Sequence, residues 1–497
     1  MTQRYIAPAL LGFSLLLTAC GGSSHGPTLL PLVPPPTTPP PAAQAPQKNV
    51  IFFLGDGMGI TTMTAARIYK VGEDGDLTMD TLPETAFVHT YSNDAQVTDS
   101  APSMSAYMTG VKMNNEVISM SPETKATDAS GKAYHVNFDS TCPSGNGQAV
   151  ETLLEQSKAK GYATGVVTTT RITHATPAAT YSHVCHRDAE NTIAAALVPG
   201  GAGYNAKLGD GIDVFFGGGT DYFLPKVNPT DKEKVGKRND GRDLTAELKT
   251  AKYSYATSKS EFDKLPIDGS TKIAGLFTKS HMAYDLDRDP TKEPSIAEMT
   301  GKAIDALAAR KKGFFLMVEG GRIDHALHAT NARRALQDTG AFDDAIKLAL
   351  DKMQAIDPGL KNTLVVVTAD HDHTLQLNGY AARTGKTEPG KPGVLGLVKN
   401  YADASKNSTD VGGNPYTIIG FGNGPRRYAT RGPISDATLE DKGYLQEAVV
   451  PMDASSDSET HGGADVFLGA QGLGADNFSG VITNTDVFGL IKKAVGL

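Results

Sequence analysis

Five short apolar runs in this chain are continuous rather than alternating, and each of them ends in a polar or glycine-rich turn. Continuous apolar runs are typical of strands that are buried on both faces, as in a parallel sheet covered by helices. The sequence therefore predicts five strands of such a sheet, at residues 49–54, 163–167, 212–216, 314–318 and 364–367.

Two longer segments, residues 295–309 and 331–353, carry apolar residues at helical spacing. Together with the strands they predict an α/β fold, in which a largely parallel central sheet is flanked by helices on both faces. Ligands of such sheets collect beyond the carboxyl ends of the strands. Three carboxylates and a histidine follow predicted strands directly, so we expect them in one crevice: Asp56, Glu319, Asp370 and His371.

Two polar stretches, residues 226–271 and 381–417, separate the predicted core elements. The length of 497 residues alone would suggest about three domains. We instead predict one large catalytic domain over residues 48–497, because Asp56 and His461, near its two ends, are candidate ligands of one metal site. The two polar stretches are then insertions on that domain.

The N-terminus contains one basic residue, Arg4, an apolar stretch over residues 6–17 and small residues before Cys20. This pattern predicts a signal peptide over residues 1–19 and resembles the lipobox of bacterial lipoproteins, which implies lipidation of Cys20. An ordinary signal peptide cleaved nearby is the alternative. Residues 20–47 would form the lipidation site and a proline-rich tether. We expect an exported, periplasmic or cell-surface protein that contacts the membrane only through its lipid anchor.

Composition and charge exclude some classes of function. The chain is 39% hydrophobic and 21% charged, which is ordinary for a globular protein. Its net charge of −8 disfavours a nucleic-acid partner, so an anionic substrate must be attracted by local metal ions or arginines. Beyond Cys20 there are two cysteines, Cys142 and Cys185. In an exported protein this pair favours one disulfide, and two unpaired buried thiols are the alternative.

Ser100 lies at the predicted start of a helix. Pro102 suits a first helical position, and Gly110 is a plausible helix stop. A serine at this place lies among free backbone N–H groups at the positive end of the helix dipole, where phosphate binds well. Most serines at helix starts are only caps, so this feature alone leaves both interpretations open.

A set of histidines and carboxylates predicts metal binding. Asp324 and His328 are four residues apart, which places them one turn apart on the same face of a helix. Asp370 and His371 are adjacent at a strand end, and His461 adds a further imidazole. Mixed nitrogen and oxygen ligands suit zinc, whereas carboxylates such as Asp56 and Glu319 also suit magnesium. Each residue alone has a structural alternative, such as a helix cap or a turn.

These residues lie in segments that resemble the motifs of alkaline phosphatases, in the order of that family. The resemblance runs from about residue 49 to the C-terminus and implies a three-layer α/β sandwich. The segments are Gly55-Asp56-Gly57-Met58-Gly59, Thr98-Asp99-Ser100-Ala101, Thr176-Pro177-Ala178-Ala179, Glu319-Gly320-Gly321-Arg322-Ile323-Asp324-His325, Thr368-Ala369-Asp370-His371 and Glu459-Thr460-His461.

The resemblance implies a phosphate monoesterase with two zinc ions, one magnesium ion and a phosphoserine intermediate. Ser100 matches the nucleophile, and Arg187 matches the arginine that binds the phosphate oxygens. The implied metal ligands are Asp324, His328 and His461 for the first zinc, Asp370 and His371 for the second, Asp56 between the second zinc and magnesium, and Thr176 and Glu319 for magnesium.

Three further histidines are assigned supporting roles. His174 and His325 occur where some members of the family have aspartate and lysine, which bears on the strength and metal preference of the magnesium site. We expect His174 to support the metal ligands and His325 to contact phosphate or water. His373 is expected to support the metal site rather than to bind metal.

Small phosphate monoesters are the expected substrates. The alternatives are a phosphodiesterase or sulfatase of the same superfamily, and a lipoprotein that binds metal or phosphate without catalysis. The family resemblance favours a homodimer, although monomers occur in the family.

Overall fold

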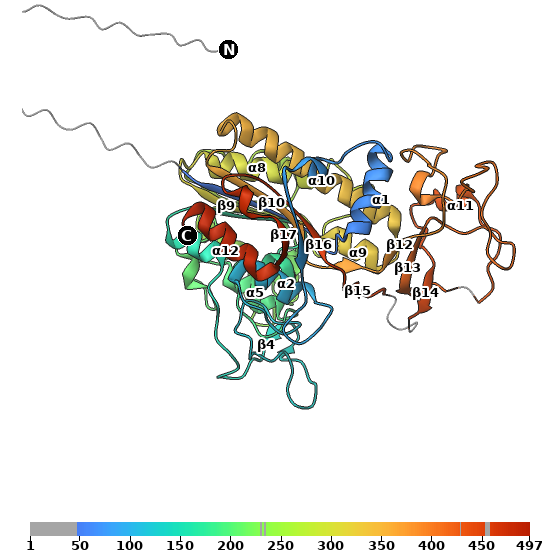
Figure 1. Ribbon diagram of the computed structural model, residues 1–497. Coiled ribbons are helices and arrows are strands. Elements are labelled where there is room, and N and C mark those ends of the chain that lie inside the picture. The colour runs from blue at the N-terminus through green and yellow to red at the C-terminus, as the bar shows by residue number, and fades with distance from the viewer. Residues whose placement is uncertain (1–46, 229–230, 233–234, 428, 453–457) are drawn as a thin grey trace, which may run out of the picture. The chain divides into compact units, whose positions relative to one another are not determined.

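A ten-stranded sheet forms the centre of the computed structural model, which describes residues 47–228, 231–232, 235–427, 429–452 and 458–497 (Figure 1). The strand order is β17-β2-β16-β10-β1-β9-β5-β6-β8-β7. All five predicted strands lie in the middle of this order, parallel to one another: β1 (Asn49–Gly55), β5 (Ala163–Arg171), β6 (Val214–Gly218), β9 (Phe314–Gly320) and β10 (Thr363–Ala369).

The burial of the three middle strands explains why their sequences are continuously apolar. Every residue of β1, β9 and β10 is buried, because helices cover both faces of the sheet. Each valine, leucine, isoleucine or phenylalanine buried in this way stabilises the fold by about 1.5–3 kcal/mol. The predicted α/β architecture is therefore confirmed.

Helices α1, α8 and α10 lie on one side of the sheet, and α2 and α12 lie on the other (Figure 1). Helix α3 packs against β5 and the short helix α5 lies close to β4. The predicted helices at 295–309 and 331–353 are confirmed as α8 and α10. The bounds are α1 (Ile60–Val71), α2 (Ser100–Thr109), α3 (Leu153–Ala159), α5 (Glu190–Ala196), α8 (Ile296–Ala308), α10 (Ala332–Ile356) and α12 (Asn484–Val495).

The edges of the sheet differ from its centre. On one edge β16 runs antiparallel to its neighbours β10 and β2, and β17 pairs parallel with β2. The other edge is formed by β8 and then β7, which comes from the polar stretch 226–271. The bounds are β2 (Glu84–His89), β7 (Tyr253–Ala256), β8 (Lys272–Leu276), β16 (Val466–Gly472) and β17 (Gly480–Thr483).

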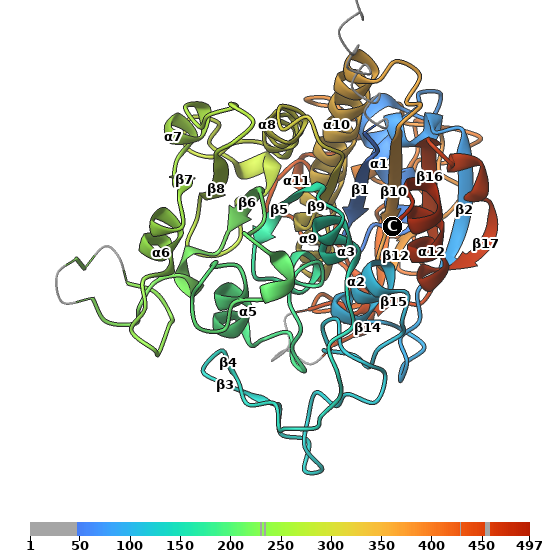
Figure 2. The ribbon, with the colours of Figure 1, turned by 90° about the vertical axis from the view of Figure 1, so that its left-hand side faces the viewer.

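A second, three-stranded sheet with α11 lies beside the central sheet, next to α1 (Figure 1). It consists of β12 (Leu375–Leu377), β13 (Ile419–Gly424) and β14 (Ala448–Pro451). The polar stretch 381–417 lies between β12 and β13 in the sequence. The other polar stretch contains α6 (Leu244–Thr250) and α7 (Lys259–Asp263) in addition to β7. Figure 2 shows α6 and α7 at the opposite end of the molecule from β17.

Shorter elements complete the described chain. They are β3 (His135–Val136), β4 (Asp139–Ser140), α4 (Ala175–Ala178), α9 (Arg322–His328), β11 (Asp372–His373), α11 (Asp436–Leu439), β15 (His461–Gly462) and the 3-10 turns Thr78–Thr81, Ala206–Leu208, Thr220–Tyr222, Asp285–Asp287, Gly393–Leu395 and Ala475–Asn477.

A disulfide joins Cys142 and Cys185, whose Cα atoms are 6.0 Å apart, and this confirms the predicted pairing. The predicted signal peptide, lipidation site and most of the tether lie outside the described residues. Among the helices that the structure describes, none combines the length and the apolar character needed to cross a bilayer.

Candidate active site

Ser100 is the first residue of α2, and Asp99 is the N-cap residue. The helix ends where predicted, because Gly110 adopts the left-handed conformation with a φ of 74°. Pro102 is the third helical residue rather than the first. Proline is tolerated there because the N–H groups of the first helical turn have no acceptor within the helix.

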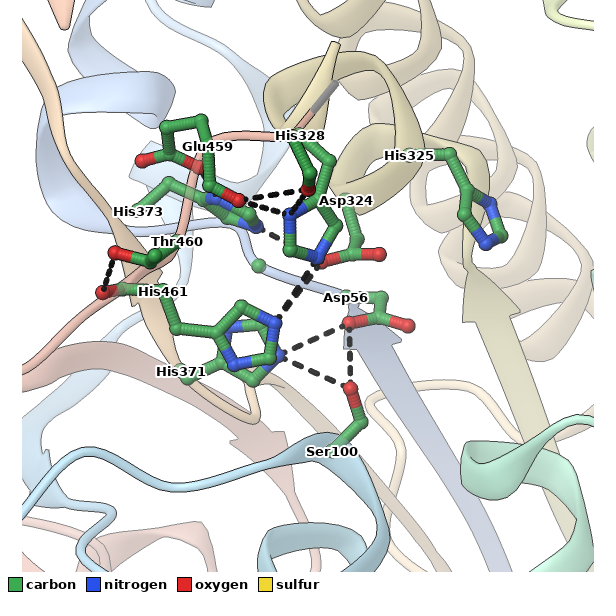
Figure 3. A network of polar contacts seen from close by, with 12 residues as sticks. Asp56, Ser100, Asp324, His325, His328, His371, His373, Glu459, Thr460 and His461 are labelled. Atoms are coloured by element: carbon green, nitrogen blue, oxygen red, sulfur yellow. Dashed lines mark hydrogen bonds and ion pairs between the residues drawn. The ribbon is translucent and has the colours of Figure 1, made fainter. Parts of the chain in front are cut away.

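The Ser100 hydroxyl points toward a histidine and an aspartate, which are side chains that commonly bind metal ions (Figure 3). Its Oγ lies 3.1 Å from Nε2 of His371 and 3.4 Å from Oδ1 of Asp56. Asp56 directly follows the carboxyl end of β1, and His371 lies two residues beyond the carboxyl end of β10. The side chain of Ser100 is almost fully buried, with 2% of the residue exposed.

A first cluster of possible ligands surrounds Asp324. Oδ1 of Asp324 lies 3.2 Å from Nε2 of His328 and 3.6 Å from Nε2 of His461. Helix α9 supplies Asp324 and His328 from one face, as their spacing predicts, and His461 comes from β15. The ligand atoms of this cluster, which also includes His373, lie within 4.8 Å of one another.

The orientation of three imidazoles favours metal binding through their Nε2 atoms. A backbone carbonyl accepts a hydrogen bond from Nδ1–H, which leaves the Nε2 lone pair free for a ligand. His328 and His461 present their Nε2 atoms to each other at 3.1 Å. Two such lone pairs repel unless a cation lies between them. The carbonyl contacts are His328 to Glu459 at 2.6 Å, His461 to Thr98 at 2.8 Å and His371 to Asp372 at 3.2 Å.

His373 differs from these histidines because both of its nitrogens contact carboxylates. Nε2 lies 2.8 Å from Asp324, and Nδ1 lies 2.5 Å from Oε2 of Glu459. Burial lowers the pKa of His373, but the two carboxylates outweigh burial and raise it to about 10. A protonated imidazole donates from both nitrogens and cannot bind a metal. The supporting role predicted for His373 fits these contacts.

The second group of ligands lies at the ends of β1 and β10. Nε2 of His371 is 3.4 Å from Oδ1 of Asp56 and 3.5 Å from Oδ2 of Asp370. The other carboxylate oxygen of Asp370 accepts a hydrogen bond of 3.0 Å from the backbone of Gly57. Asp56, Asp324 and His371 also offer ligand atoms within 4.8 Å of one another.

Asp56 connects this group to a third cluster. Asp56, His174 and Glu319 offer ligand atoms within 4.8 Å of one another. The Thr176 hydroxyl from α4 lies 3.5 Å from Oδ2 of Asp56. The structure thus places His174 close enough to be a ligand, whereas the sequence predicts a supporting role for it. Its Nδ1 is buried and has no hydrogen-bond partner among the described residues.

The buried carboxylates of the site need nearby positive charge to be stable in their ionised form. Burial, and then the carboxylates of Asp370, Asp324 and Glu319, raise the pKa of Asp56 well above its ordinary value. Burial raises the pKa of Glu319 to about 7. In the part of the chain that the structure describes, Oε1 of Glu319 and Oδ2 of Asp370 have no hydrogen-bond partner. Buried charges are stable when they are paired or coordinate metal ions, so these clusters fit bound cations.

Arg187 lies in the loop between α4 and α5, close to Asp99, the residue before Ser100. Its guanidinium forms an ion pair with Asp99, and its Nη2 lies 3.1 Å from Nε2 of His174. Its backbone N–H donates a hydrogen bond of 2.8 Å to the carbonyl of Glu116. Cys185, in the disulfide, is two residues away. A planar guanidinium held in this way can bind two oxygens of a phosphate group.

A further histidine, His281, was not predicted from the sequence. Its ring centroid lies 4.1 Å from that of His325 and 5.3 Å from that of His174, and the latter two are also 5.3 Å apart. Burial lowers the pKa of all three, that of His325 to about 3. His281 also contacts the guanidinium of Arg171. No local motif marks His281, so only the folded chain reveals it.

Comparison with known proteins identifies the family. A model of the family described as alkaline phosphatase matches residues 47–497. This chain belongs to the alkaline phosphatase family. It is 36% identical over 460 residues to the alkaline phosphatase of Gadus morhua, covering 87% of this chain and 88% of that protein. It is 37% identical to the tissue-nonspecific isozyme of Gallus gallus, over 87% of this chain and 82% of the isozyme.

Solved alkaline phosphatases share the fold. The enzyme of Thermus thermophilus aligns with a TM-score of 0.62 at 24% identity, over 91% of this chain and 92% of that one. The enzyme of the Antarctic bacterium TAB5 aligns with a TM-score of 0.60 at 24% identity, over 90% and 98%. Alkaline phosphatases are metal-dependent phosphate monoester hydrolases, and the three ligand clusters agree with membership of this family.

Proposed function

We propose that the chain hydrolyses phosphate monoesters outside the cytoplasm with Ser100 as the nucleophile, through a phosphoserine intermediate. The single observation that carries this proposal is the position of Ser100 Oγ, 3.1 Å from His371 and 3.4 Å from Asp56 at the start of α2. The hydroxyl therefore contacts two candidate metal ligands, and one of them, Asp56, also belongs to the third cluster.

Ser100 does the covalent chemistry. The hydroxyl loses its proton to water, Oγ forms a bond to phosphorus, the bond from phosphorus to the ester oxygen breaks, and that oxygen takes up a proton from water and leaves as the alcohol. Water then attacks the phosphoserine, releases inorganic phosphate and restores the hydroxyl. The first N–H groups of α2 would lie beside a phosphoryl group on Ser100 and favour its negative charge.

We propose that the ligand clusters hold two zinc ions and one magnesium ion. We assign Asp324, His328 and His461 to the first zinc and Asp370 and His371 to the second. Asp56 connects the second zinc site to the magnesium site of Thr176 and Glu319, where His174 is also within reach. Bound zinc would lower the pKa of the Ser100 hydroxyl and stabilise the negative charge of the reacting phosphoryl group. A mutant of the TAB5 enzyme has Mg bound in its M3 site.

Arg187 binds the phosphoryl oxygens in this proposal. Asp99 orients the guanidinium from one side and His174 from the other. His325 is assigned a contact to phosphate or to water, and the low pKa of its buried imidazole keeps it neutral in the active enzyme. A neutral ring can donate one hydrogen bond without adding charge.

Hydrolysis of simple aryl esters tests the proposal. The purified protein should hydrolyse 4-nitrophenyl phosphate faster than bis(4-nitrophenyl) phosphate or 4-nitrophenyl sulfate. Chelation should abolish hydrolysis, and added zinc and magnesium should restore it. Preferred cleavage of the diester or the sulfate would instead support one of the related phosphodiesterases or sulfatases. Binding of metal or phosphate without turnover would support a binding protein.

We also propose that the protein is exported and anchored through lipidated Cys20, and that it forms a homodimer. The disulfide is typical of an oxidising compartment. A related protein of Bombyx mori is a membrane-bound alkaline phosphatase. Incorporation of labelled palmitate into the wild type but not into Cys20→Ala tests the anchor. Light scattering of a protein that lacks residues 1–46 tests the dimer.

A further inference from the structure

A fourth group of ligand side chains lies outside the three clusters of the active site. His135 from β3, and His186 and Asp188 from the loop before α5, each offer one ligand atom within 4.8 Å of the others. Nε2 of His135 lies 3.7 Å from Oδ2 of Asp188, and Nδ1 of His186 lies 4.0 Å from the same oxygen. These separations exceed a hydrogen bond, so the three side chains face one another without a direct bond.

The two imidazoles are held close together. Their ring centroids are 4.5 Å apart, with the ring planes tilted by 45°. Nδ1 of His135 is buried and has no hydrogen-bond partner among the residues that the structure describes. Nδ1 of His186 accepts a hydrogen bond of 3.2 Å from the backbone N–H of Asp188. Among the described residues, Nδ1 of His135 is therefore a buried nitrogen without a partner, whereas a metal ion on Nδ1 of His186 would replace its contact with the backbone.

Carboxylates face both nitrogens of His186. Asp188 is the neighbour of Nδ1, and Oε2 of Glu116 lies 4.0 Å from Nε2. The His186 side chain is 8% exposed, while those of Asp188 and Glu116 are 55% and 42% exposed. Asp188 is therefore accessible to a cation from solvent, and the more buried imidazole of His186 lies next to it.

The chemistry of the donors indicates which cation this is. Two imidazoles and a carboxylate are typical ligands of zinc and of neighbouring first-row metals, whereas calcium and magnesium prefer all-oxygen sites. Both imidazoles bind a metal ion in their neutral form.

We propose that His135, His186 and Asp188 form a further binding site for a divalent transition-metal ion such as zinc. The site is separate from the ligands assigned to catalysis and does not depend on the proposed reaction. Three protein ligands and a partly open position suit an ion that exchanges more readily than one in a closed structural site.

The position of this site has a structural consequence. His186 and Asp188 are the two neighbours of Arg187, and His135 belongs to the separate β3–β4 hairpin. An ion bound here would join the hairpin to the loop that carries Arg187. The Cys142–Cys185 disulfide already joins the same two parts of the chain.

Zinc binding to the intact, metal-replete protein tests the site. The test variant is His135→Ala, and the control is His89→Ala, which removes a half-exposed histidine that lies 3.6 Å from a single carboxylate, Asp465. Equilibrium dialysis with elemental analysis at pH 7.5 should give one more bound zinc for the wild type and the control than for His135→Ala. Hydrolysis of 4-nitrophenyl phosphate by all three proteins should be unchanged.

A second measurement identifies the ligands. Copper(II) added to the zinc-replete protein should give an electron paramagnetic resonance spectrum with two coupled nitrogens in the wild type and in His89→Ala. In His135→Ala that signal should be lost or reduced to one nitrogen. Equal zinc stoichiometry in all three proteins, or the same copper spectrum with and without His135, would overturn the proposal.

Discussion

His373 joins Asp324 to Glu459: its Nε2 lies 2.8 Å from Oδ1 of Asp324, and its Nδ1 lies 2.5 Å from Glu459. The imidazole therefore fixes a carboxylate that also faces His328 and His461. Contacts of this type orient metal ligands, and their loss typically weakens metal binding by 10- to 100-fold.

Substitution of His373 tests this arrangement. In His373→Gln we expect roughly 10- to 100-fold weaker zinc binding, measured as activity against free zinc in a metal buffer. Because His373 positions a ligand without touching substrate, excess zinc should restore most of kcat. His89→Gln serves as the control for loss of a histidine elsewhere. Unchanged zinc dependence in His373→Gln would contradict the role assigned to this residue.

Substitution of Arg187 by lysine separates the contribution of its charge to phosphate binding from that of its planar shape. Arg187→Lys keeps the positive charge but cannot present two parallel N–H groups to a phosphate. Loss of one charge-assisted hydrogen bond costs about 1.5–3 kcal/mol, so we expect kcat/KM for 4-nitrophenyl phosphate to fall by roughly 10- to 100-fold. Inhibition by inorganic phosphate should weaken in parallel. Equal inhibition of both proteins by phosphate would show that Arg187 does not bind it.

The Cys142–Cys185 disulfide should stabilise both the fold and the loop that carries Arg187. Closure of its 43-residue separation contributes about 4 kcal/mol in the chain-entropy model, and measured values are often lower. The double variant Cys142→Ala/Cys185→Ala should therefore unfold at lower urea concentration and bind phosphate more weakly. If stability falls but phosphate affinity is unchanged, the disulfide does not position Arg187.

A pH-dependent contribution to stability is expected from His183 and Glu155. Nε2 of His183 lies 2.8 Å from Oε1 of Glu155, and both side chains are largely buried. Burial alone lowers the pKa of His183 and raises that of Glu155. Their mutual contact outweighs burial, so the pKa of His183 is raised and that of Glu155 is lowered.

The pH range in which this pair stabilises the fold follows from the directions of the two pKa shifts. The His183 contribution is complete below its ordinary pKa of 6.5 and is lost as the pH rises through the raised folded value. The Glu155 contribution is complete above 4.5 and is lost as the pH falls through the lowered folded value. The pair should therefore stabilise most between about pH 4.5 and 6.5.

Urea unfolding of the wild type and His183→Gln, both kept in chelator, measures this contribution. The difference in the free energy of unfolding should be about 2 kcal/mol at pH 5.5 and smaller at pH 9. A difference that is the same at both values would show that His183 is not charged in the folded protein.

The middle of the sheet was predictable and its edges were not. Strands β1, β9 and β10 are buried on both faces, so their apolar runs are continuous. The edge strand β17 and its neighbour β2 are partly exposed, with Phe87 51% and Val481 61% exposed, and lack such runs. β5 continues beyond its predicted end through the threonines, because Thr168 and Thr170 donate hydrogen bonds to buried Glu319.

The candidate site was predictable where regular secondary structure fixes the positions of its residues. Asp56 and Asp370 follow parallel neighbouring strands, and Asp324 and His328 share a helix face. His281 could not be predicted, since its contacts with His174 and His325 depend on three segments that are distant in the sequence.

Acid quenching of the protein during turnover tests the central proposal most directly. After incubation with a phosphate monoester and rapid acidification, peptide mass spectrometry should find phosphate on Ser100 of the wild type. Ser100→Ala should carry no phosphate and should lose at least about a thousandfold in kcat, because the covalent route is closed. Phosphate on another residue, or near-normal turnover by Ser100→Ala, would contradict the assignment of Ser100 as the nucleophile.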